Sequence, residues 1–472
     1  MITNSFQKIL KENYNGKIPQ LLDESEAIHL FLERFDELGP FKSNEYPLDP
    51  QKAITGSFIP FFNRMRDELI NPKGMSTSVT EDINEEMGNQ LQDLINTEFT
   101  DKKIEIQQRG KHGIKLMVDP NFWNGKRVFI TGHTGFKGSW LSIWLTSMGS
   151  IVKGYSLQPP TSPSLYVEAK VDELIESSIG DIRNQEELAN SMLIFDPEIL
   201  IHMAAQPLVR YSYDEPIETY EVNVIGTAKV LEVARSCKRL KAIINITTDK
   251  CYENLGFDKS FNETDPMGGV DPYSSSKGCA ELVTASYRRS FFKDLGIGVA
   301  SARAGNVIGG GDWADDRLIP DILKSFENGE KVLIRNPQAT RPWQHVLEPL
   351  SGYLILAQKL FIDPLNFSQG WNFGPKEEDV KPVKWIVDKM ATNWPQASWE
   401  LETNAQPHEA EFLKLDIAKA KINLNWSPVW SLETTLEKII MWHRAWLNDE
   451  NIQKLSINEI NEYMDDMNCE RY

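Results

Sequence analysis

Cysteine is scarce in this sequence, and its spacing argues against two classes of protein. The 472 residues contain four cysteines, at positions 237, 251, 279 and 469, and no two of them form a C-x-x-C pair. Small secreted scaffolds depend on many disulfides, and zinc sites need closely spaced cysteines or histidines. We therefore expect reduced, mostly buried thiols and no metal site.

Long apolar runs and an excess of basic residues are also absent. No run approaches the roughly 20 apolar residues that span a bilayer, and Met1–Phe6 lacks the basic and apolar regions of a secretion signal. Lysine and arginine total 50 against 68 aspartates and glutamates, a formal net charge of −18. Nucleic-acid binders usually present a basic face. These deficits favour a cytoplasmic protein that has neither a membrane nor a nucleic acid as partner.

The remaining composition is that of a folded protein with more than one structural unit. Hydrophobic residues make up 41% and charged residues 25% of the chain, which is typical of globular proteins. Residues 1–116 are polar with helix-like patches and carry no chemical motif. Residues 117–308 alternate apolar β-type runs with helical patterns, residues 309–450 are irregular and rich in Pro, Trp and Arg, and residues 451–472 form an acidic tail.

The alternating segment predicts an α/β fold. Strand and helix repetition with nearly continuous apolar strands is what a parallel sheet covered on both faces requires. We expect a Rossmann-type, doubly wound parallel sheet at 117–308, a smaller C-terminal substrate lobe with returning elements at 309–450, and a mostly helical N-terminal extension. The apolar runs that carry this prediction are Arg127–Thr131, Ile151–Tyr155, Ile199–His202, Ala242–Thr247 and Gly298–Ala302.

A glycine-rich loop follows the first of these runs. Glycines 132, 135 and 138 give G-x-x-G-x-x-G, directly after Thr131 and before a helical pattern. Glycine lets the chain turn tightly and lets a pyrophosphate approach bare backbone, while the helix N-terminus supplies N–H donors. An ordinary glycine-rich turn is the alternative, but the strand before it and the helix after it favour a dinucleotide site. The expected cofactor contacts in this loop are Gly132, Thr134, Gly135, Phe136, Lys137 and Gly138.

The second run ends at Gly154–Gln158 without the carboxylate that usually binds the adenosine ribose. No arginine is present there to receive the 2′-phosphate of NADP, so NAD is the expected cofactor. The remaining expected cofactor contacts are Asp181 and Ile182 against the adenine, and Ala204, Ala205 and Gln206 where the cofactor passes close to backbone.

Two motifs hold the candidate catalytic residues. Tyr273 and Lys277 form Y-x-x-x-K, and residues four apart on a helix share one face. A phenol with a pKa of about 10 is a weak base, but an adjacent ammonium and a positive nicotinamide ring stabilise its phenolate. Thr248, Asp249 and Lys250 follow the fourth run, at the end of a strand where ligands meet a parallel sheet. Taken alone, this triplet fits either proton transfer or an ordinary turn.

Together these motifs resemble the extended short-chain dehydrogenase/reductase superfamily, and within it the CDP-glucose 4,6-dehydratases. The glycine loop and Y-x-x-x-K are common to the superfamily. More specific are A-A-Q-P-L-V-R at 204–210, G-N-V-I-G-G-G-D-W at 305–313 and R-P-W-Q-H at 341–345. In the related dTDP-glucose dehydratases a glutamate follows the catalytic aspartate, whereas Lys250 does so here, as in the CDP-glucose pattern. The resemblance runs from about Met117 to near the C-terminus.

The resemblance implies an NAD-dependent dehydratase that converts CDP-glucose to CDP-4-keto-6-deoxyglucose without net oxidation. Tyr273 would take the proton of the sugar 4-hydroxyl as C4 gives up hydride, and Asp249 would protonate the departing 6-hydroxyl before hydride returns to C6. Thr248 would bind the 4-oxygen. Lys250 would be either the C5 base or a charged group that stabilises the enolate. The implied substrate contacts are Arg341 at the diphosphate, for which a surface salt bridge is the alternative, and Asn306 and His345.

Two other functions remain open. One is an epimerase, decarboxylase or dehydratase that acts on a GDP-, UDP- or dTDP-sugar, and the other is a regulatory or scaffold protein that binds NAD without turnover. Epimerases and decarboxylases need no proton donor for a departing 6-hydroxyl, so the triplet at 248–250 favours dehydration. The intact Tyr273 and Lys277 favour an enzyme over a scaffold. The resemblance also implies a homo-oligomer.

Overall fold

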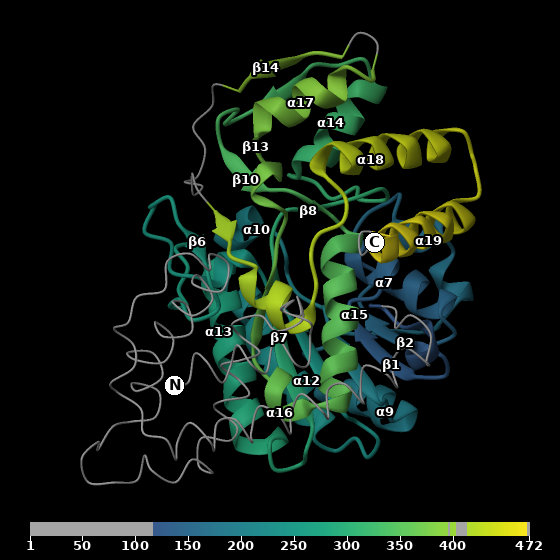
Figure 1. The fold of residues 1–472 in the computed structure, drawn as a ribbon, viewed down its shortest axis with the longest axis vertical. Helices are drawn as coiled ribbons and strands as arrows, with labels where there is room; N and C mark the ends of the chain where they lie inside the picture. The colour runs from purple at the N-terminus through teal and green to yellow at the C-terminus, as the bar shows by residue number, and fades with distance from the viewer. Residues whose placement is uncertain (1–116, 395–396, 403–412, 470–472) are drawn as a thin grey trace, which may run out of the picture. The chain divides into compact units, whose positions relative to one another are not determined.

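A parallel sheet forms the centre of the fold (Figure 1). The computed structural model describes residues 117–394, 397–402 and 413–469, so the expected N-terminal extension at 1–116 lies outside the described residues. The strand order is β12-β7-β5-β4-β1-β2-β3, and every neighbouring pair is parallel. Because the chain winds outward from β1 in both directions, the predicted Rossmann-type, doubly wound fold is confirmed. The strands are β1 (Arg127–Thr131), β2 (Ile151–Ser156), β3 (Glu176–Ile179), β4 (Ile199–His202), β5 (Ala242–Ile246), β7 (Gly298–Ala304) and β12 (Gly370–Phe373).

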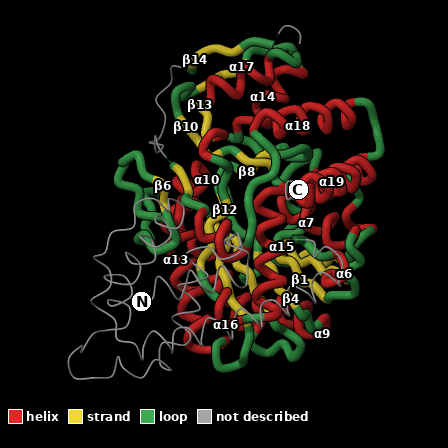
Figure 2. Tube along the Cα trace, in the orientation of Figure 1, coloured by secondary structure: helices red, strands yellow, loops and turns green. Residues whose placement is uncertain are grey.

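Helices cover both faces of this sheet, as the red helices on either side of the yellow strands in Figure 2 show. Side chains alternate along a strand, so Val128 and Ile130 of β1 join one apolar cluster and Phe129 joins another. The first cluster includes α7 (Phe136–Ser147) and α15 (Leu347–Ile362), and the second includes α9 (Gln185–Phe195) and α12 (Thr227–Ala234). Burial on both faces explains why the strands are nearly continuous apolar runs.

Shorter helices connect these elements. None of the helices in the described ranges is long and apolar enough to cross a membrane. The helices that pack around the main sheet and have not yet been named are α6 (Pro120–Trp123), α8 (Leu165–Glu168), η5 (Val171–Glu173), α10 (Val209–Asp214), α11 (Pro216–Tyr220), η6 (Glu221–Gly226), η7 (Asp249–Cys251), α13 (Pro272–Tyr287), η8 (Arg288–Phe292) and α16 (Pro364–Phe367).

A smaller lobe with its own core lies beyond the carboxyl ends of the strands (Figure 1). Leu323, Ile386 and Ile439 are almost completely buried in it, and they belong to α14, α17 and α18. Between α14 and α17 the chain returns to the main sheet and forms α15 and β12. The helices of the lobe are α14 (Leu318–Glu327), η9 (Glu377–Asp379), α17 (Val383–Ala391) and α18 (Leu432–Leu447). Helix η10 (Ala420–Leu424) packs instead in the core cluster of α7 and α15. Four two-stranded sheets pair β6 (Ser260–Phe261) with β15 (Lys414–Leu415), β8 (Val307–Ile308) with β11 (Gln344–His345), β9 (Val332–Ile334) with β14 (Trp399–Leu401), and β10 (Thr340–Pro342) with β13 (Val380–Pro382).

The segment at 451–472, which the sequence identifies as an acidic tail, contains helix α19 (Ile452–Cys469). Ile460, Tyr463 and Met467 of this helix are buried in the same cluster as α7 and α15. The Tyr463 hydroxyl donates a 2.6 Å hydrogen bond to the buried Glu348 carboxylate of α15. Helix α19 is therefore amphipathic, with Glu462 and Asp465 exposed and the opposite side in the core.

Candidate active site

The predicted site residues follow the carboxyl ends of neighbouring strands. Thr131 of β1 pairs with His202 of β4, and His202 pairs with Asn245 of β5, so these strands end at one edge of the sheet. Ligands of doubly wound folds bind at this edge. The register therefore brings together the glycine loop, the loop after β4 and the triplet after β5.

The glycine loop has no room for side chains at two of its three glycines. Gly132 has a φ of +80°, and a Cβ on it would lie 2.7 Å from the backbone nitrogen of Ala204. A Cβ on Gly138 would lie 2.1 Å from the carbonyl oxygen of Gly132. Gly135 differs, because it caps α7 with a φ of −78°, and the nearest atom to an added Cβ would be 3.5 Å away. Space beside bare backbone at a helix N-terminus fits a diphosphate.

This difference predicts separate outcomes for alanine at Gly135 and at Gly138. Gly135→Ala should keep the melting temperature of the wild type but weaken NAD binding about tenfold, because its methyl group enters the space for the diphosphate. Gly138→Ala should destabilise the fold by about 2 kcal/mol, because its methyl group meets backbone. Thermal melting and a fluorescence titration with NAD measure the two effects. Unchanged NAD affinity in Gly135→Ala would place the cofactor elsewhere.

Thr134 and Phe136 anchor the loop, whereas Lys137 lies among the catalytic residues. Thr134 Oγ1 donates a 2.9 Å hydrogen bond to the backbone just after β2, and Phe136 packs against the main core. Burial, followed by the charges of Lys277 and Arg317, lowers the pKa of Lys137 to about 7. Lys137 therefore belongs to the cationic centre of the site rather than to a solvated surface.

The loop after β4 is held by side chains that follow it. The backbone nitrogen of Gln206 donates a 2.8 Å hydrogen bond to Asn223 Oδ1, and Gln206 Nε2 donates a 2.9 Å hydrogen bond to Thr219 Oγ1. The Gln206 side chain is thus bonded to protein. Ala204 and Ala205 are partly exposed, so of the three predicted cofactor contacts they are the ones that a ligand at this edge can reach.

Asp181 and Ile182 follow β3 and have different surroundings. Asp181 Oδ2 accepts a 2.7 Å hydrogen bond from Arg183 Nη2. Although burial opposes the effect, the hydrogen bonds from Arg183 hold the pKa of Asp181 below its usual value. Ile182 is 4% exposed and packs in the cluster of α9 and α12. Asp181 is therefore the more accessible of the two predicted adenine contacts.

Sequence reasoning missed His133, which lies between the glycine loop and the strands β2 and β3. A Cβ on Gly154 of β2 would lie 2.2 Å from the His133 ring, and His133 Nε2 lies 2.7 Å from Ser177 Oγ of β3. Burial lowers the pKa of His133 to about 4, so the ring is neutral at neutral pH. A histidine inside a glycine loop is the signal that could have marked this position.

Asp249 is buried beside a hydroxyl and two cations. It is 1% exposed, and its Oδ1 accepts a 2.9 Å hydrogen bond from Thr248 Oγ1. Oδ2 has no hydrogen-bond partner among the described residues and packs so closely on Gly305 that a Cβ there would lie 1.6 Å away. Burial raises the pKa of Asp249, and the charges of Lys250 and Arg341 oppose this rise. The carboxyl group is therefore suited to carrying a proton.

Helix α13 presents Tyr273 and Lys277 to the same point. The Asp271 side chain caps the helix, and Tyr273 follows in its first turn with 8% of its surface exposed. Burial raises the pKa of Tyr273 to about 12, although a hydrogen bond with Thr248 opposes the rise. Lys277 Nζ donates a 3.3 Å hydrogen bond to the carbonyl oxygen of Ile246 at the end of β5. Burial lowers the pKa of Lys277 to about 8.

The fold thus brings the five predicted catalytic residues together from two motifs that are far apart in the sequence. The two motifs lie next to each other, because the Thr248 side chain acts on the pKa of Tyr273. Arg317 was missed by sequence reasoning. It forms a 2.9 Å ion pair with Asp312, and its charge acts on both Tyr273 and Lys137. It precedes α14 in an irregular segment, where no motif marks it.

Two of the three predicted substrate residues border this centre. Arg341 of β10 is 8% exposed, and its charge acts on Asp249. Asn306 has a φ of +43°, and its buried Nδ2 has no hydrogen-bond partner within the ranges that the structure describes. A buried amide group that lacks a protein partner fits a ligand contact.

The side chain of His345, the third predicted substrate residue, is packed against α19, and its role as a substrate contact stays a prediction. The residue is 0% exposed, and its Nε2 lies 3.1 Å from Glu459 Oε1 of α19. The rings of Trp140 and Trp430 lie 6.3 Å and 5.0 Å from the imidazole. His345 therefore joins α19 to the core.

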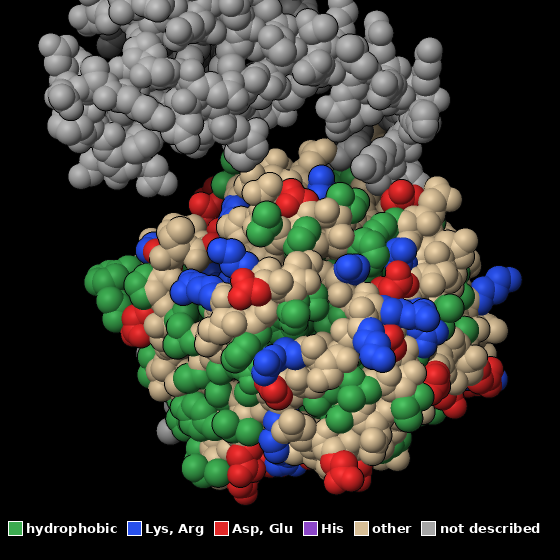
Figure 3. Space-filling view, turned by 90° about the horizontal axis from the view of Figure 1, so that it is seen from below, with side chains coloured by type: hydrophobic (Ala, Val, Ile, Leu, Met, Phe, Trp, Pro, Cys, Tyr) green, Lys and Arg blue, Asp and Glu red, His purple; other side chains and the backbone are tan. Residues whose placement is uncertain are grey.

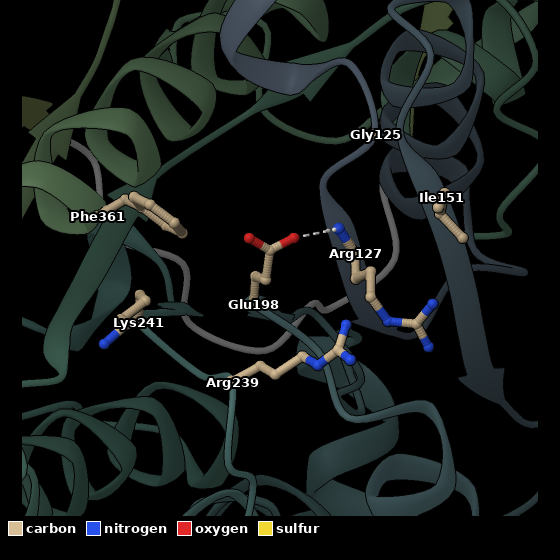
Figure 4. Close-up of a pocket in the computed structure, with 7 residues that line it drawn as sticks. All are labelled: Gly125, Arg127, Ile151, Glu198, Arg239, Lys241 and Phe361. Atoms are coloured by element: carbon tan, nitrogen blue, oxygen red, sulfur yellow. Dashed lines mark hydrogen bonds between the residues drawn. The ribbon is translucent and has the colours of Figure 1, made fainter.

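A cavity of about 520 Å³ lies at the opposite, amino-terminal edge of the strands (Figure 4). Two of its three cations have protein partners: Arg127 Nε donates a 3.1 Å hydrogen bond to the carbonyl oxygen of Phe195, and Arg239 lies 3.6 Å from Asp196. None of the predicted site residues lines it. The face seen from below in Figure 3 carries basic, acidic and hydrophobic side chains close together. The lining residues are Gly125, Arg127, Ile151, Glu198, Arg239, Lys241 and Phe361.

Known proteins are similar to this chain in sequence and in fold. The profile of the family described as GDP-mannose 4,6 dehydratase matches residues 129–439. A CDP-glucose 4,6-dehydratase of Salmonella typhimurium is 58% identical over 354 residues, which cover 74% of this chain and 99% of that protein. A solved dTDP-glucose 4,6-dehydratase of Bacillus anthracis in complex with NAD has a TM-score of 0.58 and 21% identity, and the match covers 69% of this chain and 99% of that one. A UDP-glucose 4-epimerase of Thermotoga maritima with UDP-glucose has a TM-score of 0.59 and 21% identity, with coverage of 68% and 99%. At such identity, the two solved structures show the shared fold.

Proposed function

The chain belongs to the GDP-mannose 4,6-dehydratase family, and we propose that within this family it converts CDP-glucose to CDP-4-keto-6-deoxyglucose. The observation that carries the proposal is the 58% identity to a CDP-glucose 4,6-dehydratase over 99% of that relative. The triplet at 248–250 supports it, because a buried carboxyl group with a raised pKa can protonate a departing hydroxyl.

NAD is the cofactor of this reaction, and the residues present fit it. The glycine loop provides backbone without side chains at the N-terminus of α7, and Ala204 and Ala205 leave the neighbouring loop open. When bound, NAD would supply the hydride acceptor for C4 of the sugar and the hydride donor for C6. The backbone of Ala204 fills the space beside Gly132, so the diphosphate fits best beside Gly135.

Tyr273 removes the proton of the 4-hydroxyl. Its pKa of about 12 without ligands must fall for this role, and the positive charge of Lys277 on the same helix face favours the phenolate. Thr248 already contacts both Tyr273 and Asp249, so its hydroxyl can bond the 4-oxygen as negative charge develops there.

Asp249 then supplies the proton that leaves with the 6-hydroxyl as water. The 4-ketone acidifies the hydrogen at C5, and Lys250 is placed beside Asp249 to remove it or to stabilise the enolate that results. Burial keeps Asp249 protonated to a higher pH than an exposed aspartate. The proton removed from C5 returns to C5 when hydride adds to C6. The proton that Tyr273 takes from the 4-hydroxyl equals the one that Asp249 gives to the 6-oxygen, so the sugar loses one water overall.

Arg341 and Asn306 are proposed to bind the nucleotide sugar. The Arg341 guanidinium is planar and suits two phosphate oxygens, and it is already close enough to influence Asp249. Asn306 Nδ2, which has no hydrogen-bond partner among the described residues, can donate to the sugar or to a phosphate. Both residues come from the strands and loops that join the sheet to the smaller lobe.

We propose that the protein is a cytoplasmic homo-oligomer. Three large apolar side chains are exposed on elements that pack side by side: Ile217 of α11, Ile225 of η6 and Leu282 of α13, at 71%, 51% and 61%. Exposed apolar patches of this kind mark protein interfaces. The free cysteines of the described chain fit a reducing compartment. Light scattering should find more than one chain per particle, and Leu282→Asp should lower the mass whereas Leu365→Asp on α16 should not.

The proposed reaction is tested by incubating the purified protein with NAD and each of four sugars: CDP-, UDP-, GDP- and dTDP-glucose. With CDP-glucose we expect a product lighter by one water that shows the alkali-induced absorbance of a 4-keto sugar. Faster turnover of another nucleotide sugar would contradict the proposal that CDP-glucose is the substrate. An epimer with unchanged mass would contradict dehydration.

A further inference from the structure

A buried ion pair lies beneath the two catalytic motifs. Glu281 of α13 and Arg303 of β7 are each 5% exposed, and Arg303 Nε and Nη2 donate hydrogen bonds of 2.9 Å and 2.8 Å to the two carboxylate oxygens. The hydroxyls of Thr247 and Ser301 also donate to Glu281, at 2.6 Å and 2.5 Å. The carboxylate therefore joins the catalytic helix to the ends of β5 and β7.

The same pair holds both ends of the catalytic triplet. Thr247, which precedes Thr248, donates to Glu281. Tyr252, which lies two residues after Lys250, accepts a 2.7 Å hydrogen bond from Arg303 Nη1. The Tyr252 hydroxyl in turn donates a 2.6 Å hydrogen bond to Asn372 Oδ1 of β12. The segment from 248 to 251 is thus fixed on each side by one buried network.

Glu281 also shares a helix face with the catalytic residues. Tyr273, Lys277 and Glu281 are spaced four apart on α13, so they follow one another along one side of the helix. We propose that Glu281 is a positioning residue for the reaction: paired with Arg303, it fixes the helix that carries Tyr273 against the triplet strand and holds a negative charge one turn from Lys277. This inference rests on the proposed function for the roles of Tyr273 and Lys277.

The charge on Glu281 has a consequence that can be measured at Lys277. Burial lowers the pKa of Lys277 to about 8, whereas the negative charge of Glu281 raises it. Because Tyr273 needs the ammonium form of Lys277, activity should fall as the pH rises through this pKa. Loss of the Glu281 charge should therefore move the alkaline limb of the pH profile to lower pH. The titratable groups that face Lys277 are Cys251 of η7, Glu281 of α13, Lys137 of α7 and His202 of β4.

The test compares Glu281→Gln with a control variant at an uncharged residue of the same helix, Thr284. We expect Glu281→Gln to lower kcat at neutral pH about tenfold, to leave KM for CDP-glucose unchanged and to move the alkaline limb down by about one pH unit. Glu281→Asp keeps the charge and should restore the position of the limb. Thr284→Val is the control, because Thr284 also links α13 to β5, through a 2.7 Å hydrogen bond from Asn245, but carries no charge. Thr284→Val should lower the stability of the fold without shifting the alkaline limb of the pH profile.

Two further measurements keep the inference testable if Glu281→Gln folds poorly. The double variant Glu281→Gln/Arg303→Gln leaves no unpaired buried charge and should keep the shifted limb. Competitive labelling with acetic anhydride reports the pKa of Lys277 without turnover or cofactor, so it separates this inference from the proposed function. If wild type converts CDP-glucose but neither the limb nor the Lys277 labelling pKa changes in these variants, the inference is overturned.

Discussion

Replacing Tyr273 by phenylalanine is expected to lower kcat for CDP-glucose about a thousandfold while NAD affinity stays within a few-fold of the wild type. The variant removes only the phenolic oxygen that takes the proton of the 4-hydroxyl, and it keeps a ring that is 8% exposed. Because the phenol has no part in binding the diphosphate beside Gly135, cofactor binding should persist. Single-turnover kinetics and an NAD titration measure the two quantities.

Tyr353→Phe is the matched control for this prediction. Tyr353 is a second buried phenol of the same region: Asp249 influences its pKa, yet its hydroxyl has no hydrogen-bond partner in the part of the chain that the structure describes. Its loss should leave kcat close to the wild-type value. Full activity in Tyr273→Phe, or a collapse of activity in Tyr353→Phe, would move the role of the base to another residue.

Asp249→Asn should stop the reaction one step later. The amide has nearly the same shape as the carboxyl group but cannot give up a proton to the departing 6-hydroxyl, so dehydration should slow about a thousandfold. Oxidation at C4 does not need this proton. The near-ultraviolet absorbance of reduced nicotinamide should therefore accumulate in Asp249→Asn and stay absent in Tyr273→Phe. Stopped-flow absorbance with CDP-glucose measures this difference.

The raised pKa of Asp249 adds a pH dependence to this prediction. The step needs the protonated carboxyl group, so its rate in the wild type should fall as the pH rises through the pKa of Asp249, which burial moves above that of an exposed aspartate. Asp249→Asn should lose this dependence. Product formation at the wild-type rate by Asp249→Asn would contradict the assignment of the proton donor.

Much of the sheet was predictable, because burial on both faces makes a strand visible as an apolar run. The five predicted runs match β1, β2, β4, β5 and β7 within two residues at each end. Two strands of the seven-stranded sheet were not predicted. β3 (Glu176–Ile179) is polar and partly exposed along its length, and β12 (Gly370–Phe373) follows the smaller lobe in the sequence but returns to the sheet. Edge strands carry less of the apolar pattern on which sequence reasoning depends.

The catalytic set was predictable for a different reason. Tyr273 and Lys277 lie four apart on one helix, and the triplet follows directly on a strand, so local spacing places each motif. Contacts that depend on the tertiary fold were not predictable. His345 belongs to a specific motif, yet it is buried against Glu459, and Glu281 and Arg303 meet only because α13 packs on the sheet.

The most direct measurement follows the hydrogen at C4. CDP-glucose that carries deuterium at C4 should give a product in which the same deuterium is at C6, because hydride taken from C4 is returned within one active site. Mass spectrometry and NMR of the product locate it. A CDP-4-keto-6-deoxyglucose with no deuterium at C6 would contradict the account. So would deuterium at C6 of the product when unlabelled CDP-glucose reacts in deuterated water.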